Sequence, residues 1–284
     1  MKKKSFPVGL SFDVDGETLW TARDPENAKR PVQLSMGAYG LIEGVPRILK
    51  LLAKYELPAS FFVPGMICER YPDVVRRIAG MGHEIGNHGY SHTHPHKFSA
   101  EDAERNELIR TSALIEKLSG KPPKGYRSPA WEFSPRTVNL LRELGIDWSS
   151  NMMHTDQIHR LEVFGQKTDI VEIPVSWMLD DAAYWLYSLL LVGKAMQPLA
   201  AVEEYWKTEF EELYREYMED EAGERKNQCY MLTCHPQVIG RPARMKLLET
   251  VVCFIRSFPN VEFMTGAQMR DRYRKLANEA EFQA

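Results

Sequence analysis

The stretch Ser11-Phe12-Asp13-Val14-Asp15-Gly16-Glu17, preceded by the apolar Val8-Gly9-Leu10, predicts a buried strand that runs into a glycine turn. Side chains on a strand alternate between its faces, so Asp13 and Asp15 should point to the same face. Two carboxylates at one strand end repel each other and lose hydration unless a metal or a cationic partner compensates them. The alternative is a solvated turn rich in Asp and Gly. Partners elsewhere in the chain decide between these interpretations.

Length and composition are those of a globular protein with a sizeable core. The chain has 284 residues, of which 44% are hydrophobic and 26% charged. No linker divides it, which favours one domain over residues 1–284. The formal net charge is -3 and no basic block exceeds Lys2-Lys3-Lys4, so we expect neither nucleic acid nor a membrane as partner. Without a signal peptide or an apolar run of about 20 residues, we expect a cytoplasmic protein.

Apolar strands and amphipathic helices alternate along the N-terminal part of the chain. A helix at 45–55 precedes a strand at 59–63, and a helix at 72–81 precedes a strand at 84–87. This alternation predicts a parallel sheet with helices outside it, in which functional groups collect at the carboxyl ends of the strands. The segment 19–44 has no clean period, and we interpret it as a long insertion beside these ends.

Two histidines, His88 and His92, directly follow the strand at 84–87. If the backbone makes one helical turn, the two imidazoles come onto one face in a chelating geometry. Such a pair alone is weak evidence, but this one lies at a strand end in the same predicted sheet as Asp15. Two imidazoles and one carboxylate form a three-ligand site with open positions for water, as in catalytic metal centres. The sequence therefore predicts a divalent-metal site.

Two further strand ends deliver polar side chains. Arg127 leaves a strand into a proline-containing loop, and its apolar surroundings favour a buried ion pair with a carboxylate, for which Asp13 is the obvious candidate. His235 follows the apolar strand at 230–234 and is the third histidine at a strand end.

The segment from about 182 to 226 is predicted as a helical insertion dense in aromatic residues. Most of them recur at helical spacing, so packing is their default role, with a lid or a subunit contact as the alternative. The aromatic residues are Tyr184, Trp185, Tyr187, Tyr205, Trp206, Phe210, Tyr214 and Tyr217.

Taken in order, these segments resemble the motifs of the polysaccharide deacetylase family, also called carbohydrate esterase family 4 or NodB-homology proteins. That family carries an aspartate-rich first strand, a His-x-x-x-His segment, an Arg-x-Pro segment, a serine-rich segment and a late Leu-x-x-His strand. The matching segments span nearly the whole chain and are Ser11 to Glu17, His88 to His92, Arg127-Ser128-Pro129, Trp148 to Met152, and Leu232 to Pro236.

The resemblance implies an α/β fold, a distorted (β/α) barrel of about seven parallel strands. It also implies a divalent metal ion, most often Zn2+, and a division of labour among the site residues. In that division Asp13 is the catalytic base, Asp15, His88 and His92 are the metal ligands, Arg127 is the ion-pair partner of the base, and His235 is the general acid.

One motif departs from the family pattern. Relatives carry an Asp before the paired serines of the fourth motif, and this Asp supports the acid histidine, whereas Ser149 stands there in this chain. Either a neighbouring carboxylate such as Asp147, Asp180 or Asp181 orients His235, or its protonation is tuned less strongly.

The resemblance implies a hydrolase of carbon-nitrogen bonds other than peptide bonds. The leading expectation is N-deacetylation of an amide in a small-molecule or amino-sugar substrate. The alternatives are ring opening of a cyclic imide or an allantoin-type ureide, and a metal-binding homologue without catalysis. The insertion at 19–44, Val175-Ser176-Trp177 and Ile239-Gly240-Arg241-Pro242 look most like the intracellular branch of the family, whose members form oligomers, so a dimer or tetramer is expected.

Overall fold

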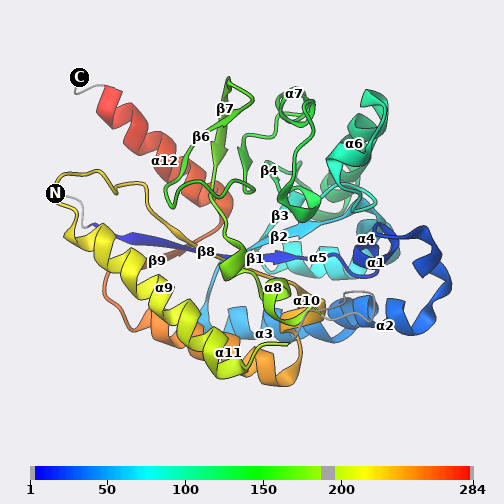
Figure 1. Cartoon of the computed structure of the whole chain (residues 1–284), viewed down its shortest axis with the longest axis horizontal. Coiled ribbons are helices and arrows are strands. Elements are labelled where there is room, and N and C mark those ends of the chain that lie inside the picture. The colour runs from blue at the N-terminus through cyan, green and yellow to red at the C-terminus, as the bar shows by residue number, and fades with distance from the viewer. Residues whose placement is uncertain (1–3, 187–195, 282–284) are drawn as a thin grey trace.

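The computed structural model describes residues 4–186 and 196–281 (Figure 1). Its centre is a nine-stranded sheet. The strands are β1 (Phe6–Asp13), β2 (Ser60–Val63), β3 (Glu84–Asn87), β4 (Gly125–Tyr126), β5 (Trp148–Ser149), β6 (His159–Val163), β7 (Gln166–Glu172), β8 (Tyr230–Cys234) and β9 (Val261–Met264). Their order in the sheet is β6-β7-β5-β4-β3-β2-β1-β8, and β9 also pairs with β1.

Every strand except β6 pairs in parallel, and β6 forms an antiparallel hairpin with β7. The sheet curls into a half-barrel, and an isolated antiparallel bridge between Gln157 and Gln228 links the residues that lead into β6 and β8. The predicted distorted α/β barrel is thus confirmed. All eight residues of β1 are buried, since this strand is central in the sheet and pairs with β2, β8 and β9.

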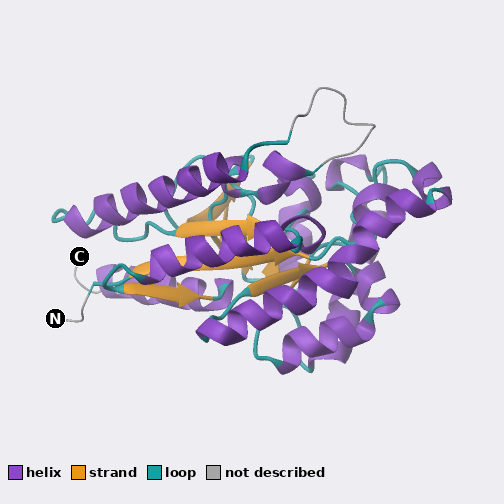
Figure 2. Ribbon diagram, turned by 90° about the horizontal axis from the view of Figure 1, so that it is seen from below, coloured by secondary structure: helices purple, strands orange, loops and turns teal. Residues whose placement is uncertain are grey.

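The helices lie outside the strands, as Figure 2 shows. They are α1 (Thr18–Thr21), α2 (Pro31–Tyr39), α3 (Val45–Tyr55), α4 (Gly65–Arg70), α5 (Pro72–Gly80), α6 (Glu101–Ser119), α7 (Thr137–Glu143), α8 (Asp181–Trp185), α9 (Leu199–Glu219), α10 (Pro236–Ile239), α11 (Pro242–Arg256) and α12 (Gly266–Glu281). The apolar residues of α3 fall on one face at helical spacing and are buried in the main core. Burial of such faces against the sheet is what holds the helices in place.

The insertion at 19–44, which lacks a clean period in the sequence, is largely helical. It forms α1, α2 and a wide helical turn at Gly40–Gly44 that leads into α3. Two of its glycines allow it to approach α10 closely. A Cβ on Gly44 would lie 2.2 Å from the carbonyl oxygen of Pro236, and one on Gly40 would lie 2.7 Å from the backbone nitrogen of Gln237. The insertion therefore supports the short helix that follows His235.

The aromatic segment forms α8 and α9, and packing is the observed role of its buried members. Trp206 and Phe210 are fully buried, and the ring of Phe210 meets Phe6 of β1 edge-on at 5.9 Å. Tyr217 is buried against the same residue, with ring centroids 5.3 Å apart. Tyr187 lies outside the described residues.

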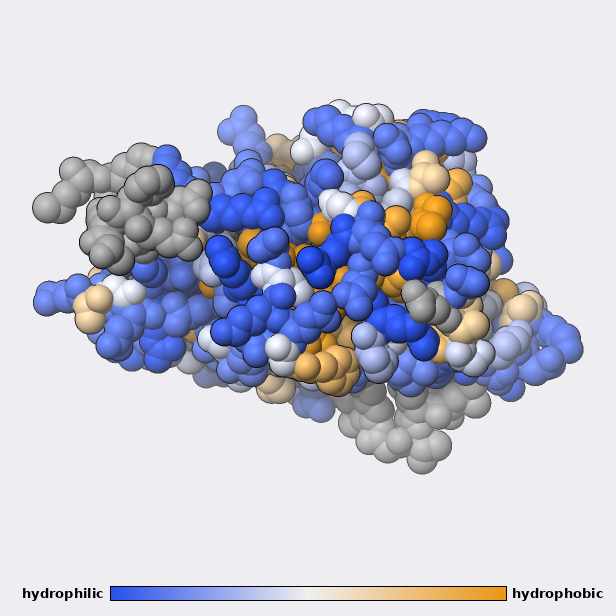
Figure 3. All heavy atoms as spheres, turned by 90° about the horizontal axis from the view of Figure 1, so that it is seen from above, coloured by the Kyte–Doolittle hydropathy of each residue, from blue (hydrophilic) through white to orange (hydrophobic). Residues whose placement is uncertain are grey.

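Hydrophilic side chains cover most of the face in Figure 3, and apolar ones show only in small patches. Within the part of the chain that the structure describes, no helix combines the length and the apolar character that a membrane span requires.

Candidate active site

The carboxyl ends of β1 and β8 bring Asp13 and His235 side by side. The two strands run in parallel with Ser11 opposite Thr233 and Phe12 opposite Cys234, so the next residue on each strand stands at the same level. Oδ2 of Asp13 lies 4.0 Å from Nε2 of His235. Both side chains are at most about a tenth exposed.

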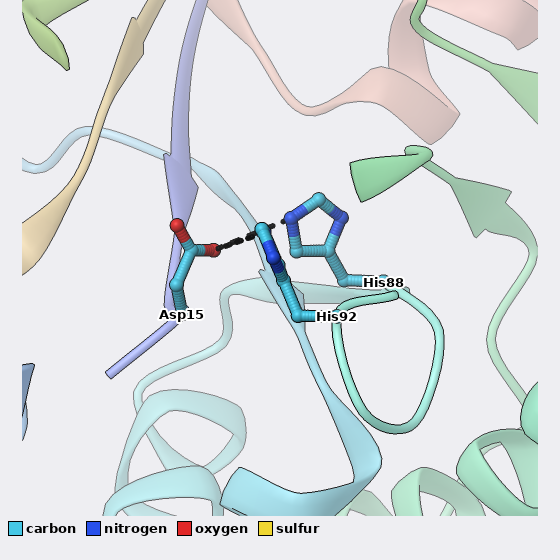
Figure 4. Close-up of side chains that lie close together, drawn as sticks. All are labelled: Asp15, His88 and His92. Carbon is cyan, nitrogen blue, oxygen red and sulfur yellow. Dashed lines mark ion pairs between the residues drawn. The ribbon is translucent and has the colours of Figure 1, made fainter. Parts of the chain in front are cut away.

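Asp15, His88 and His92 converge next to this pair (Figure 4). Oδ1 of Asp15 lies 3.3 Å from Nε2 of His88 and 3.4 Å from Nε2 of His92. The two imidazole rings are 5.0 Å apart. Nδ1 of His88 lies 2.7 Å from the carbonyl oxygen of Arg127, which can only accept a hydrogen bond. The proton of the His88 imidazole therefore sits on Nδ1, and the lone pair of Nε2 is directed toward Asp15.

The two histidines come together through an irregular loop, so the helical turn considered from their spacing is wrong. Gly89 and His92 have left-handed backbones, with φ of 69° and 62°. Such a φ is uncommon outside glycine and persists only where surrounding contacts enforce it. Here Oε2 of Glu107 on α6 accepts the backbone N–H groups of Tyr90 and Ser91 at 2.8 and 2.7 Å.

The burial and contacts of Asp15 fit a residue that can coordinate a cation. It is fully buried, and its Oδ1 has no hydrogen-bond partner among the described residues, although a buried oxygen of this kind normally has one. Burial alone would raise the pKa of Asp15, but the imidazoles of His92, His88 and His235 together hold it well below its usual value. An ionised carboxylate oxygen facing two imidazole nitrogens fits a divalent transition metal such as zinc.

Arg127 forms the predicted ion pair with Asp13. Its guanidinium is completely buried, and Nη1 donates to Oδ1 of Asp13 and to Oγ of Ser11, each at 2.8 Å. Nη2 donates to Oγ of Ser150 at 2.8 Å, and Nε donates to the carbonyl oxygen of the same residue at 3.2 Å. The guanidinium also lies 4.3 Å from the centre of the Phe62 ring. Asp13 is therefore held in one orientation.

The carboxylate that orients His235 is Asp181. Its Oδ1 lies 2.7 Å from Nδ1 of His235, while Oδ1 of Asp180 lies 3.4 Å from the same nitrogen. Asp147, the third candidate from the sequence, instead pairs with Arg270 at 2.6 Å. Burial alone would lower the pKa of His235, but Asp180, Asp181 and Asp15 raise it well above its usual value. This imidazole thus favours its protonated form, as a proton donor requires.

Ser149, which stands where relatives carry the aspartate of the fourth motif, contacts a carboxylate other than those near His235. The hydroxyl of Ser149 donates to Glu172, a fully buried carboxylate at the end of β7. Burial raises the pKa of Glu172, and hydrogen bonds from Ser149, Met152 and Asn151 oppose this rise. The sequence analysis did not single out Glu172. The available signal is a carboxylate within the apolar run Ile170-Val171-Glu172-Ile173, where burial demands a partner.

The structure thus gathers the six predicted site residues at one edge of the sheet. Asp13, Asp15, Arg127 and His235 lie within a chain of contacts no longer than 4.0 Å, and His88 and His92 join it through Asp15. A buried carboxylate held by arginine, a carboxylate and two imidazoles that could bind a cation, and a third imidazole held by carboxylates are the kinds of group that a metal-assisted hydrolase uses.

Comparison with known proteins identifies the family. Residues 37–149 match the family model described as polysaccharide deacetylase. The chain is 31% identical to the peptidoglycan deacetylase of Helicobacter pylori over 96% of this chain and 97% of that protein. The chain therefore belongs to the polysaccharide deacetylase family, whose members hydrolyse carbon-nitrogen bonds other than peptide bonds and generally use a divalent metal.

Solved structures agree with this assignment. A protein from Mycobacterium smegmatis, assigned as a polysaccharide deacetylase, superposes with a TM-score of 0.86 at 32% identity, covering 98% of this chain and 93% of its own. PuuE allantoinase superposes with a TM-score of 0.80 at 21% identity, covering 97% of this chain and 92% of its own. At that identity the second likeness shows the fold alone.

Proposed function

We propose that this protein is a zinc-dependent N-deacetylase that hydrolyses an acetamido group on a small-molecule or amino-sugar substrate. The observation that carries the proposal is the arrangement of Asp13 between Arg127 and His235, directly beside the ligand set of Asp15. The choice of deacetylation is supported by the peptidoglycan deacetylase of Helicobacter pylori, which aligns with this chain over almost the whole length of both proteins.

Asp15, His88 and His92 would hold the metal. Two imidazole nitrogens and one carboxylate oxygen are the donors that zinc prefers in catalytic centres, where further positions stay open for water and substrate. A divalent cation held there supplies Lewis acidity, which polarises an amide carbonyl and lowers the pKa of water toward about 7. The unpartnered Oδ1 of Asp15 is the structural support for this assignment.

The protein's own groups move the protons. Asp13, oriented by Arg127, accepts a proton from the attacking water. His235, charged through its contact with Asp181, donates a proton to the departing nitrogen, which leaves as an amine. Nε2 of His235 lies only 4.0 Å from Oδ2 of Asp13, so both groups reach the same reacting centre. Burial of both groups strengthens their electrostatic interactions with the substrate.

A cyclic imide or ureide is the second candidate substrate, and the burial of the site favours it. The ligands Asp15, His88 and His92 are 0%, 1% and 5% exposed, and the base Asp13 is 2% exposed. The stacked indoles of Trp131 and Trp177, 4.3 Å apart, follow two of the strands whose ends meet there. A compact ring fits such a buried centre more readily than a long glycan does.

A small panel of substrates tests these alternatives. The purified protein is analysed for bound metal and then assayed on chitooligosaccharides, N-acetylglucosamine, succinimide and allantoin. Acetate release from the amino sugars supports the deacetylase proposal, and ring opening with no acetate release replaces it with the imidase. Zinc in the protein without turnover on any amide or imide would favour a metal-binding homologue without catalysis.

Several expectations from the sequence stay predictions. They are the single domain over residues 1–284, the assembly into a dimer or tetramer, the cytoplasmic location, and the absence of nucleic-acid and membrane partners.

A further inference from the structure

We propose that Glu172 is a positioning residue for Asp13, acting through the segment 149–152 and the side chain of Arg127. The inference rests on the proposed function, in which Asp13 is the base. It adds a group outside the six site residues and gives the buried carboxylate of β7 a role in the reaction.

Glu172 fixes the loop that follows β5. Its Oε1 accepts the backbone N–H groups of Asn151 and Met152 at 2.5 and 2.7 Å, and its Oε2 accepts the hydroxyl of Ser149. Two successive amides that share one oxygen leave the backbone little freedom to rotate. Glu172, Ser149 and Ser150 are each 0% exposed, so bulk water does not compete for these bonds in the intact protein.

The loop at residues 149–152 in turn makes hydrogen bonds with the side chain of Arg127 and with the backbone of the next residue. Ser150 accepts from Nε through its carbonyl oxygen and from Nη2 through its hydroxyl. Oδ1 of Asn151 accepts the backbone N–H of Ser128 at 2.8 Å, which ties the residue after Arg127 to the same loop. The remaining polar contacts of the guanidinium, on Nη1, go to Asp13 and Ser11. A displacement of this loop would therefore change the position of the Arg127 guanidinium relative to Asp13.

This path is separate from the contact that Asp181 makes with His235. Asp181 contacts His235 directly, whereas Glu172 reaches Asp13 through the loop and Arg127. In this chain two carboxylates from different segments support the two proton-transfer groups separately. The substitution of either one should accordingly affect one group and leave the other in place.

Glu172→Gln and Glu172→Ala separate positioning from general stability. Glutamine keeps an oxygen for the two amides, so it should retain at least a third of the wild-type kcat. Alanine leaves both amides without an acceptor and should lower kcat by about 100-fold, the effect of a misplacement of about 1 Å, while KM changes less than threefold. Both variants should bind one zinc per chain. Glu162→Ala, which removes an exposed carboxylate of the neighbouring strand, is the matched control.

Hydrogen exchange and a crystal structure supply readouts besides activity. In Glu172→Ala the amides of Asn151 and Met152 should exchange at least tenfold faster, and the contact between Arg127 and Asp13 should lengthen beyond 3.5 Å. The assay uses a substrate of the panel described above that the wild-type protein hydrolyses. If it hydrolyses none of them, the proposed function fails, but the exchange rates and the geometry of Arg127 still test the positioning role.

Three results would overturn the inference. The first is an alanine variant that melts at a lower temperature but has wild-type kcat per folded, zinc-loaded chain. The second is loss of zinc from that variant, which would place Glu172 in support of the ligands. The third is an unchanged contact between Arg127 and Asp13 in its crystal structure.

Discussion

Asp181 contacts His235 through both the side chain and the backbone. Its Oδ1 lies 2.7 Å from Nδ1 of the imidazole, and its two oxygens accept the backbone N–H of the same residue at 2.9 and 3.0 Å. An ionised carboxylate has no proton to donate and can only accept hydrogen bonds. The imidazole therefore donates from Nδ1 to Asp181 and presents Nε2 to Asp13 and Asp15. Asp181 thus fixes the position of the imidazole, and it shares with Asp180 and Asp15 the stabilisation of its positive charge.

Replacing Asp181 with Asn should narrow the pH range of activity. The carboxylate stabilises the imidazolium and raises the pKa of His235, so its removal lowers that pKa. A general acid works only while protonated, and the alkaline limb of kcat/KM should therefore move to lower pH. We expect kcat at pH 8 to fall by about 10- to 100-fold, less than the roughly 100- to 10,000-fold that a general acid contributes, because His235 itself is retained. Asp147→Asn, which alters the pair with Arg270, should leave the profile unchanged.

The two carboxylates of β1 and its turn should respond differently to the same substitution. Asp15→Asn removes a ligand oxygen and should lose both zinc and turnover. Asp13→Asn should keep zinc and lose about 100- to 10,000-fold in kcat, because the base is gone. Metal content by mass spectrometry, measured beside kcat, checks both. An Asp13→Asn protein that loses its metal would contradict the separation of roles.

Arg127→Ala should destabilise the fold as well as abolish turnover. The substitution leaves Asp13 buried without its cation, and breaking a buried ion pair from one side costs about 3–5 kcal/mol. Urea denaturation of the zinc-loaded protein measures the change in the free energy of unfolding. Arg76→Ala is the control, since its pair with Asp73 is exposed and should contribute no more than about 1 kcal/mol.

Removal of metal should lower the melting temperature reversibly. A ligand that binds only the folded state stabilises it by about 2.7 kcal/mol at 100 times its Kd, so dialysis against a chelator should lower the Tm and added zinc should restore it. His88→Ala should have a Tm that no longer responds to zinc. If that variant still responds, the stabilising ion binds elsewhere.

Gly44 should resist substitution because of its contact with α10. A Cβ there would lie 2.2 Å from the carbonyl oxygen of Pro236, so alanine must displace the helix that follows His235. We expect a loss of about 1–3 kcal/mol in unfolding free energy and a lower kcat. Gly80→Ala in α5 meets nothing within 4 Å and should instead stabilise by about 0.5–1 kcal/mol. Equal effects of the two substitutions would argue against the contact.

Local patterns predicted the strand ends well, because a buried parallel strand followed by a turn has a clear signature. Asp13, Asp15, His88 and His235 could be placed at one edge from that signature alone, and Arg127 could be paired with Asp13. The helix α2 was not predicted, since its apolar residues do not fall on one face, and exposed Val32 lies in its first turn. The hairpin of β6 and β7 was missed as well.

The supporting carboxylates show a different limit of sequence reasoning. Asp181 was one of three carboxylates considered as the partner of His235. Only the structure shows that Asp181 contacts His235, whereas Asp147 pairs with Arg270. Glu172 reaches the site through the backbone of another strand, and such a contact leaves no spacing pattern along the chain. Residues that act through tertiary hydrogen bonds are therefore found only in the structure.

The pairing of β1 with the last two strands has a consequence for synthesis on the ribosome. Leu10 pairs with Leu232, and Val8 pairs with Phe263, so two of the three neighbours of the first strand are made more than 200 residues after it. The third neighbour, β2, lies at Ser60–Val63 and is made early. Asp15, His88 and His92 are all translated within the first 92 residues, long before His235. A nascent chain thus carries all three candidate ligands while β1 has only β2 to pair with. Contacts between residues so far apart in the sequence slow folding, and apolar surface left exposed in the meantime favours aggregation.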